Sequence, residues 1–581
     1  GRTPATPERT RVLVTELGFG RGRVWERPPS AVPAAGETTP TDISRVVEVM
    51  RSAADQAGVP APRKPWLPVL ATVYDLAKLP QRTDTRLALG VQDDPEHQAQ
   101  RTAYFRPDAE GNLAVFGAGG SGKSVVLRTL AASASITPRG GPVHVYALDF
   151  GGGALGPLEV LPNVGAVVSG GDTERVDRLL TWLRRVVDER AVRYAQRRAS
   201  TIEEYREAAG ATEEPRILLL VDGFPAFRQE YESVAGRTSA YAVFQQILGD
   251  GRAVGVHVAL SADRPGSVPA SIATGIQRTV VLRQADENGY LALDAPRDVL
   301  SATSPPGRAI DLPGGLEMQI AVLGGSASLA EQSRAFERLA AVVPARPAYR
   351  AQPVLRLPEV VPAATMPDEV GGLPVLGVAD DTLAPVGFTP SGTFLVSGPS
   401  SSGRTTTVLQ LAQALRRWRP GLRIVHLTGR TSPLSSMPVW TASERALDAV
   451  AALAAETTAL VKEPPSAGGG PVVVVIEALS DFLGTPAEAP LTELIKQAKR
   501  NEHLVIAEAD SSSWGSTWPL VMEVRSGRRG IALQPDQMEG DLLFRTSFPR
   551  ISRTEFPPGR GLVVEAGKVR RIQVPRPGGD S

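Results

Sequence analysis

The stretch Gly117-Ala118-Gly119-Gly120-Ser121-Gly122-Lys123-Ser124 decides the fold. It follows a short apolar run, Asn112–Phe116, which predicts a strand, and it precedes a helical stretch, Ser124–Ser135. A strand, a glycine-rich loop of the form G-x-x-x-x-G-K-[ST] and a helix, in this order, are typical of a phosphate-binding loop. The backbone N–H groups of such a loop curl around phosphate oxygens, and the helix N-terminus adds its dipole.

A lysine and a serine at the end of this loop are suited to bind a nucleotide with its metal ion. Lys123 would neutralise the β- and γ-phosphates, and Ser124 would offer its hydroxyl to Mg²⁺. The predicted nucleotide-binding residues are Gly117, Ala118, Gly119, Gly120, Ser121, Gly122, Lys123, Ser124 and Val125. The alternative is a glycine-rich turn without a ligand, which the flanking strand and helix disfavour.

A carboxylate after a second apolar run completes the predicted metal site. Asp222 follows the run Ile217–Val221, and a carboxylate at the carboxyl end of a buried strand can hold a Mg²⁺-bound water beside the loop. We therefore predict Lys123 and Asp222 as catalytic residues, and Ser124 and Asp222 as metal ligands. Motors of this class usually carry a second acid next, which polarises the attacking water, but this chain has Gly223 there. The residues thus predict phosphate binding with weak or no hydrolysis.

The chain contains these landmarks twice, in the same order. In the first copy they are Leu89-Gly90-Val91-Gln92-Asp93-Asp94, the loop at 117–124, Asp222 and Pro306-Gly307-Arg308; in the second they are Leu376-Gly377-Val378-Ala379-Asp380-Asp381, a loop at 398–405, Glu477 and Pro558-Gly559-Arg560. The spacing between matching landmarks shrinks along the chain. One architecture is therefore used twice, and the second copy is the shorter one.

The second loop departs from the pattern at its charged positions. Its predicted nucleotide-binding residues are Gly398, Pro399, Ser400, Ser401, Ser402, Gly403, Arg404, Thr405 and Thr406. Arg404 replaces the lysine, and a planar guanidinium differs from an ammonium in length and hydrogen-bonding geometry. Glu477 replaces the aspartate, and Ala478 follows it. This pattern indicates a degenerate site that binds nucleotide without turnover or is empty, with a serine- and glycine-rich turn as the alternative.

Short apolar runs alternate with helical stretches in both copies, which predicts an α/β fold of tandem P-loop NTPase domains, with mostly parallel sheets flanked by helices. Helices are expected, among others, at Thr173–Arg198 and Ser443–Val461, and near the N-terminus at Asp42–Ala57, after a possible strand at Arg11–Glu16. The predicted domains are an N-terminal extension and linker from a preceding domain at 1–80, an ATPase-like domain at 81–345, a Pro-rich linker at 346–366 and a degenerate ATPase-like domain at 367–581.

Composition excludes several classes of protein. The chain has 581 residues, with 63 Lys+Arg against 62 Asp+Glu, which disfavours a strongly basic chain that coats nucleic acid. It has no Cys, so disulfides, thiolate metal sites and Cys nucleophiles are excluded. No stretch approaches the roughly 20 apolar residues of a membrane-spanning helix. The chain begins with Gly rather than Met, and we expect it to be a piece of a longer protein.

Several further segments carry a resemblance to a known family. They are Leu148-Asp149-Phe150-Gly151-Gly152-Gly153-Ala154-Leu155, Leu161-Pro162-Asn163-Val164-Gly165, Arg252-Ala253-Val254-Gly255-Val256-His257 and Ala262-Asp263-Arg264-Pro265. Together with the first loop they resemble the FtsK/SpoIIIE family of P-loop ATPases and, within it, the EccC ATPase of the type VII (ESX) secretion system. The resemblance implies that the tandem P-loop NTPase domains are of RecA-like or FtsK-like type. The resemblance covers about residues 60–581 and is weaker in the second copy.

The resemblance implies ATP and Mg²⁺ as ligands and a role in protein export. EccC proteins carry N-terminal membrane helices and three tandem ATPase domains, so this chain is similar to the part with the last two. The resemblance further implies recognition of WXG100-class substrates through a C-terminal signal, contact with other secretion-complex subunits, self-association, and a place at the cytoplasmic face of the plasma membrane. Gly223, Arg404 and Glu477 depart from the family pattern.

Two other functions compete with this interpretation. A double-stranded DNA translocase of the FtsK type would show a basic channel lining and usually a small winged-helix module after the motor. A non-enzymatic scaffold would bind nucleotide only to regulate a catalytic domain outside this chain. In ring-forming ATPases an arginine reaches the phosphate of a neighbour. The candidates for that arginine are Arg252, Arg264, Arg308, Arg500 and Arg560.

A Pro-rich segment precedes each copy, at Val59–Leu70 and at Val343–Pro367. Each contains a Leu-Pro element, Trp66-Leu67-Pro68 in the first and Arg356-Leu357-Pro358 in the second. A stiff spacer is the simple interpretation. The alternative is that each element docks in a groove on the preceding domain. The last domain would then have that groove open for the signal peptide of an exported protein.

Overall fold

The computed structural model describes residues 42–60, 66–80, 83–136, 139–232, 239–343, 346–465, 471–549, 551 and 555–578. The chain divides into two compact units, residues 1–67 and 68–581, and the second unit contains both P-loop domains. The strand expected at Arg11–Glu16 lies outside the described residues. None of the described helices is both long and apolar enough to cross a lipid bilayer.

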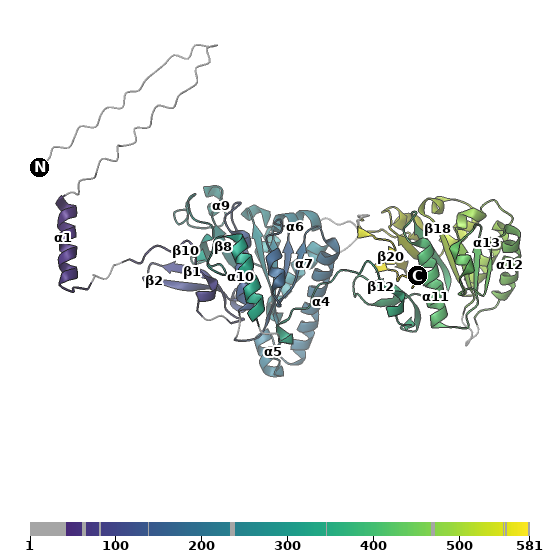
Figure 1. The fold of residues 1–581 in the computed structure, drawn as a ribbon, viewed down its shortest axis with the longest axis horizontal. Coiled ribbons are helices and arrows are strands. Elements are labelled where there is room, and N and C mark those ends of the chain that lie inside the picture. The colour runs from purple at the N-terminus through teal and green to yellow at the C-terminus, as the bar shows by residue number, and fades with distance from the viewer. Residues whose placement is uncertain are drawn as a thin grey trace, which may run out of the picture. The chain divides into compact units, whose positions relative to one another are not determined.

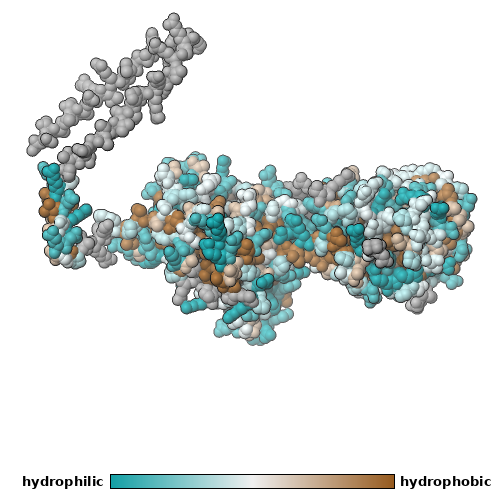
Figure 2. All heavy atoms as spheres, viewed as in Figure 1, coloured by the Kyte–Doolittle hydropathy of each residue, from teal (hydrophilic) through white to brown (hydrophobic). Residues whose placement is uncertain are grey.

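The first unit contributes one described helix, α1 (Asp42–Gln56), which confirms the helix expected there. Its sequence is strongly amphipathic, yet none of its residues is buried. Apolar side chains lie exposed along it, as the hydrophobic colours on this helix in Figure 2 show.

A ten-stranded sheet forms the first P-loop domain (Figure 1), in the order β2-β1-β10-β9-β8-β3-β7-β6-β4-β5. The strands are β1 (Leu87–Asp94), β2 (Ala99–Phe105), β3 (Leu113–Phe116), β4 (Val143–Asp149), β5 (Val164–Ser169), β6 (Arg216–Asp222), β7 (Val256–Ala262), β8 (Arg278–Leu282), β9 (Arg308–Leu312) and β10 (Leu316–Ile320). The strands from β8 to β5 run parallel, and β9, β10, β1 and β2 extend the sheet in antiparallel pairs.

Helices cover both faces of this sheet, so its central strands are apolar on both sides. The helices are α2 (Pro107–Glu110), α3 (Lys123–Ser135), α4 (Thr173–Gln196), α5 (Ile202–Ala209), α6 (Phe224–Tyr231), α7 (Ala240–Asp250), α8 (Ala270–Ala273), α9 (Glu287–Leu291) and α10 (Leu329–Val342). One buried cluster joins the sheet to α4, α6 and α7, and a second joins its other face to α3 and α10. Strand β6 is buried along its whole length, which positions Asp222 rigidly at its end.

The second P-loop domain repeats this topology. Its sheet has the order β11-β12-β21-β20-β19-β14-β18-β17-β15-β16, with β13 paired to β12. The strands are β11 (Glu369–Val370), β12 (Leu373–Ala379), β13 (Pro385–Gly387), β14 (Gly392–Gly398), β15 (Ile424–Thr428), β16 (Ala442–Glu444), β17 (Val473–Glu477), β18 (Leu504–Asp510), β19 (Gly530–Leu533), β20 (Arg560–Glu565) and β21 (Lys568–Gln573). Its α-helices are α11 (Arg404–Trp418), α12 (Leu447–Leu460), α13 (Glu488–Arg500) and α14 (Pro519–Arg525).

The two sheets match strand for strand at the core. In each sheet, the strand before the P-loop lies between two parallel neighbours. The strand that ends in Asp222 or Glu477 lies two positions away from that strand. Helix α11 covers one face of the second sheet, and α12 and α13 cover the other (Figure 1). The predicted tandem α/β fold with mostly parallel sheets is confirmed.

One predicted helix begins in the wrong place. The helix expected at Ser443–Val461 begins at Leu447, because Ala442–Glu444 pair with β15 as the parallel edge strand β16. An alanine-rich sequence favours a helix but does not indicate where a preceding edge strand ends. The sequence pattern therefore predicted one helix where the structure has a strand followed by a helix.

Candidate nucleotide site and its degenerate counterpart

The first loop has the backbone of a phosphate cradle. It joins β3 to α3, and α3 begins at Lys123 after Gly122 in the left-handed region. Gly120 has φ +71°, and a Cβ on Gly119 or Gly120 would meet no atom within 4 Å. The loop backbone therefore faces open space, at the N-terminus of a helix, where anions are favoured.

Two predicted metal ligands lie in contact beside this loop. The Ser124 hydroxyl donates to Asp222 Oδ2 at 2.7 Å. Ser261, on the neighbouring strand β7, donates to Asp222 Oδ1 at 2.5 Å and accepts from the Gly223 amide at 2.9 Å. Ser261 is completely buried, and Asp222 is only 2% exposed. The sequence analysis missed Ser261; its signal was a polar residue near the end of an apolar strand.

Lys123 makes bonds that a phosphate could replace. Its Nζ donates to the carbonyl oxygens of Gly117 and Ala118, at 2.8 and 3.1 Å, and pairs with Asp263 at 2.8 Å. The Asp263 side chain is 70% exposed, and an ion pair with so exposed a partner contributes only about 0–1 kcal/mol. Lys123 is thus free to exchange this partner for a polyphosphate. Asp263 is a second residue that the sequence analysis missed.

The position after Asp222 has a conformation that restricts the side chain there. Gly223 has φ +76°, and a Cβ on it would lie 3.0 Å from the backbone C and O atoms of Phe150. A second acid at this position would therefore be strained and crowded. The second domain places Ala478 at the corresponding position with φ +53°. Neither domain has an acid immediately after the strand carboxylate.

These residues fit a magnesium nucleotide. A hydroxyl and a carboxylate already in contact form an all-oxygen pair of the type Mg²⁺ prefers, and the lysine supplies the compensating charge. Lys123, Ser124 and the loop amides would hold the phosphates, while Asp222, oriented by Ser261, would hold the water shell of the ion. A bound ion would supply charge neutralisation at the γ-phosphate.

The second loop holds its cation differently. Arg404 pairs with Glu508 at 3.0 Å and with Asp510 at 3.6 Å. The Glu508 side chain is only 1% exposed, and its other oxygen accepts from the Ala478 amide at 2.8 Å. Burial raises the pKa of Glu508 despite the nearby arginines. Breaking a buried ion pair by removing one partner costs about 3–5 kcal/mol, so Arg404 is far less free than Lys123.

A carboxylate also replaces the neutral group under this loop. Glu508 lies at the position of Ser261, since β18 pairs with β14 as β7 pairs with β3. Glu477 bonds with the ring of His426 at 3.2 Å, and not with the loop. Burial would raise the pKa of Glu477, but hydrogen bonds from His426 and Ser432 outweigh burial and lower it. Two buried carboxylates disfavour a triphosphate here.

Two of the arginines that were candidates for reaching a neighbour's phosphate bond with the Pro-rich linkers of this chain instead. Arg308 donates to the carbonyl oxygens of Leu70-Ala71 at 2.9 and 3.2 Å. Arg560 donates to those of Leu357-Pro358 at 2.7 and 3.0 Å. Both are at least nine-tenths buried. Arg252 is exposed but bonds with two backbone carbonyls at 3.1 and 3.0 Å. Arg264 and Arg500 are exposed as well.

We call Arg308 and Arg560, with the linker carbonyls that they hold, the arginine clamps. They connect each linker to its P-loop. The residue before each arginine donates its amide to the loop backbone: Gly307 to Ser121 and Gly559 to Ser402, each at 2.8 Å. The repeated Pro-Gly-Arg motif therefore carries two contacts at once, one to the loop and one to the linker. The sequence showed the repeat, but it could not show which segments the arginine holds.

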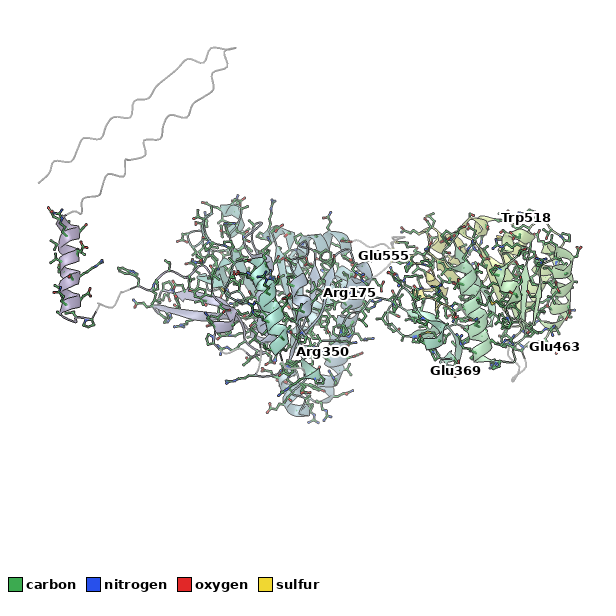
Figure 3. All side chains as sticks on the ribbon, in the orientation of Figure 1. Arg175, Arg350, Glu369, Glu463, Trp518 and Glu555 are labelled. Atoms are coloured by element: carbon green, nitrogen blue, oxygen red, sulfur yellow. The ribbon has the colours of Figure 1, made fainter. Side chains whose placement is uncertain are left out.

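The second linker also docks on the first domain, as one hypothesis expected. Arg175, which projects from α4 (Figure 3), donates to the Val354 carbonyl at 2.9 Å. The Leu357 amide donates to Glu174 at 2.7 Å, and Arg356 pairs with Asp172 at 2.8 Å. This linker is not a simple spacer. It lies along α4 of the domain before it and is clamped by the domain after it.

The fold and the two loops define a tandem P-loop protein, in which the first loop has the residues predicted for a nucleotide site and the second loop is altered. Residues 80–303 match the model of the FtsK/SpoIIIE family. This match covers most of the first P-loop domain and confirms its predicted resemblance to the FtsK/SpoIIIE family.

Relatives outside this domain extend the likeness to most of the chain. The chain is 28% identical over 550 residues to the ESX-4 secretion system protein EccC4 of Mycobacterium tuberculosis. This match covers 89% of this chain and 43% of that protein. The chain thus spans less than half the length of this relative. The predicted resemblance to EccC proteins is confirmed.

Solved structures share the fold of both domains. The cytoplasmic domain of the Thermomonospora curvata type VII secretion ATPase EccC matches with a TM-score of 0.71 and 23% identity, over 90% of this chain and 65% of that one. ATPases 2 and 3 of the same protein, in complex with a signal sequence peptide, match with a TM-score of 0.69 and 23% identity, over 90% of this chain and 98% of that one.

Proposed function

We propose that this chain is the ATP-binding motor and receptor portion of a type VII protein secretion ATPase, placed at the cytoplasmic face of the plasma membrane. In this proposal the first domain binds Mg·ATP through Lys123, Ser124 and Asp222. The observation that carries it is the contrast between a loop lysine with exchangeable partners and a loop arginine paired with a buried carboxylate. The named EccC relatives support the assignment to secretion.

The second loop, Gly398–Thr406, binds nucleotide weakly or not at all in this proposal. Ser401 has φ +65° at the position of Gly120, so the loop keeps its curled shape without the residue that adopts it most easily. Arg404 would have to leave Glu508 before it could reach a phosphate. The second domain retains the architecture of a nucleotide site, but the arginine of its loop is paired with carboxylates of the same domain.

The last domain serves as the receptor for a WXG100-class substrate in this proposal. One solved relative was determined with a signal sequence peptide bound. Within this chain, an extended linker docks along α4 of the first domain. The matching helix of the last domain is α12, whose outer face is exposed. A C-terminal signal segment would occupy this face in the manner of the linker.

The stoichiometry of ATP binding to the full chain tests the nucleotide assignment. We expect calorimetry with Mg·ATP to give one site per chain, and Lys123→Ala to abolish it because the only exchangeable loop cation of the two is lost. Arg404→Ala is the matched control and should leave that site unchanged. Retained binding in Lys123→Ala, or none in the wild type, would contradict the proposal. Single-turnover hydrolysis by the same variants separates a motor from a scaffold.

Titration of a substrate C-terminal peptide into the full chain tests the receptor assignment. Ala452→Arg places a charged side chain on the exposed face of α12, so we expect it to weaken peptide binding. Ala330→Arg, on an exposed position of α10, is the matched control. Equal binding by both variants would exclude this face as the receptor.

A further inference from the structure

An aspartate lies at the same place beside each of the two loops. Asp263 directly follows strand β7, and Asp510 ends strand β18. Strand β7 pairs with β3 so that Asp263 comes level with Gly117, the first residue of the first loop. Strand β18 pairs with β14 so that Asp510 lies opposite Gly398, the first residue of the second loop. The order of the strands therefore places one carboxylate at the start of each loop.

Both carboxylates pair with the cation of their loop, but they are held differently. Lys123 Nζ lies 2.8 Å from Asp263 Oδ1, and the Asp263 side chain is 70% exposed. Arg404 lies 3.6 Å from Asp510, whose Oδ1 also accepts from the amide and the hydroxyl of Ser512, at 3.2 and 2.9 Å. Asp510 is therefore fixed by its own turn, whereas the ion pair with Lys123 holds the exposed Asp263 carboxylate at the first loop.

The Asp263 carboxylate takes one of the bonds that the loop lysine can make. An ammonium has three donors, and Lys123 uses them for the carbonyl oxygens of Gly117 and Ala118 and for Asp263. The two carbonyl oxygens belong to the loop itself, and the carboxylate comes from the strand beside it. A P-loop lysine contacts the β- and γ-phosphates together. Since the carboxylate is the anion among these three partners, it stands in the place of a phosphate on the lysine.

The neighbouring carboxylate, Asp222, has different surroundings. It accepts from Ser124 and Ser261 at 2.7 and 2.5 Å and is 2% exposed, so its position is fixed. Its charge would be compensated by Mg²⁺. Asp263, in contrast, loses its cation as soon as Lys123 turns to a phosphate. The Asp263 carboxylate and the γ-phosphate are then like charges beside one lysine, and like charges that share a site repel each other.

We propose, on the basis of the Mg·ATP binding proposed for this site, that Asp263 makes the first site discriminate between nucleoside triphosphates and nucleoside diphosphates. A diphosphate would contact the loop and leave the ion pair between Lys123 and Asp263 in place. A triphosphate would displace the carboxylate from the lysine and then bind beside it. Asp263 therefore lowers the affinity for ATP and leaves the affinity for ADP nearly unchanged. The ratio of the two affinities is shifted towards ADP.

Calorimetry of the full chain with Mg·ATP and with Mg·ADP, at one ionic strength, measures this discrimination. Asp263→Asn keeps the size of the side chain and removes its charge. We expect it to tighten ATP binding about five- to tenfold, a factor that the repulsion of two unit charges about 4 Å apart at an exposed site accounts for. ADP binding should change less than about twofold, because an exposed ion pair contributes little. Asp510→Asn is the matched control, since it removes the equivalent charge of the altered domain, and it should leave both affinities as in the wild type.

The other outcomes contradict the proposal. If Asp263→Asn tightens ATP and ADP binding equally, Asp263 competes with any phosphate and does not discriminate. Unchanged ATP affinity would mean that the ion pair has no effect on the ligand, and weaker ATP binding would mean that Asp263 helps to hold it. Asp263→Ser also removes the charge and should give the same shift, so a folding defect of one variant is recognised. A wild type that binds neither nucleotide would refute the nucleotide assignment as well. Binding that Lys123→Ala abolishes and Asp263→Asn leaves unchanged would refute this inference alone.

Discussion

At the residue scale, the two loops differ in how firmly each cation is held. Lys123 pairs with an aspartate that is 70% exposed, while Arg404 pairs with a glutamate that is 1% exposed. The first pair contributes about 0–1 kcal/mol, and breaking one of the second kind costs about 3–5 kcal/mol. Ligand exchange at the first loop is therefore easy, and at the second loop it is not. The difference follows from the strand under the loop, and only in part from the loop sequence.

This comparison predicts how the second site could be restored. Replacing Arg404 by Lys and Glu508 by Ser gives the second domain the charges of the first. We expect ATP binding to rise from one to two sites per chain, because the buried carboxylate no longer neutralises the loop cation. Calorimetry of the double variant measures this. Arg404→Lys alone is the control and should stay at one site, since the new lysine would remain paired with Glu508.

The loops and Asp222 could be predicted because their chemistry depends on neighbours in sequence. Ser261, Asp263 and Glu508 could not, because strand order brings them to the loop and the sequence does not state that order. The arginines of the Pro-Gly-Arg motifs were misread for a similar reason. Their side chains are buried and bond with the linkers, and the sequence does not indicate in which direction an arginine side chain points. The two Leu-Pro elements were also paired wrongly, because the sequence does not show that Arg308 holds Leu70-Ala71 whereas Arg560 holds Leu357-Pro358.

At the scale of elements, the arginine clamps attach linkers to the loops. Arg560→Met keeps the apolar stem of the side chain and removes its bonds to Leu357-Pro358 and to Gln573. We expect the second linker to loosen, since charge-assisted bonds to buried carbonyls are lost. Limited proteolysis should cleave within 351–366 about tenfold faster than in the wild type. The exposed Arg297→Met should be cleaved at the wild-type rate, and an unchanged rate in Arg560→Met would argue against the clamp.

A carboxylate between β12 and β13 predicts a pH dependence of stability. Burial raises the pKa of Asp380 to about 6, although Arg571 nearby opposes the shift. Between about pH 4 and pH 6 the folded chain holds a proton that the unfolded chain has released. The free energy of unfolding therefore falls as pH rises through this window and then levels off.

Asp380→Asn mimics the protonated side chain and should remove this dependence. We expect its thermal midpoint to match the wild type near pH 4 and to exceed it near pH 7. The difference should be about 6–12 °C, because two pKa units correspond to about 3 kcal/mol and each kcal/mol shifts the midpoint by about 2–4 °C in a domain of this size. Asp368→Asn, at an exposed position, is the control and should show no such pH-dependent gain. A constant difference across this pH range would mean that the gain is not due to titration.

At the scale of the whole molecule, the balance of charge bears on the competing function. The chain has 63 Lys+Arg against 62 Asp+Glu. Several arginines that could form a basic stripe are instead bonded to carboxylates or backbone carbonyls, among them Arg178, Arg216, Arg308 and Arg560. A surface whose cations are already paired releases few counterions from a duplex. This pairing favours the proposed secretion function over a DNA translocase.

Duplex DNA binding at graded salt measures this directly. We expect no saturable binding to the full chain at about 0.15 M salt and, where binding appears at low salt, a slope of log K against log salt no steeper than about −3, since each phosphate contact adds about −0.9. Adding Mg·ATP should not steepen the slope, and Lys123→Ala should behave as the wild type. Tight binding with a steep slope that depends on Mg·ATP and Lys123 would favour a DNA translocase, because only a motor on DNA would couple its nucleotide site to phosphate contacts.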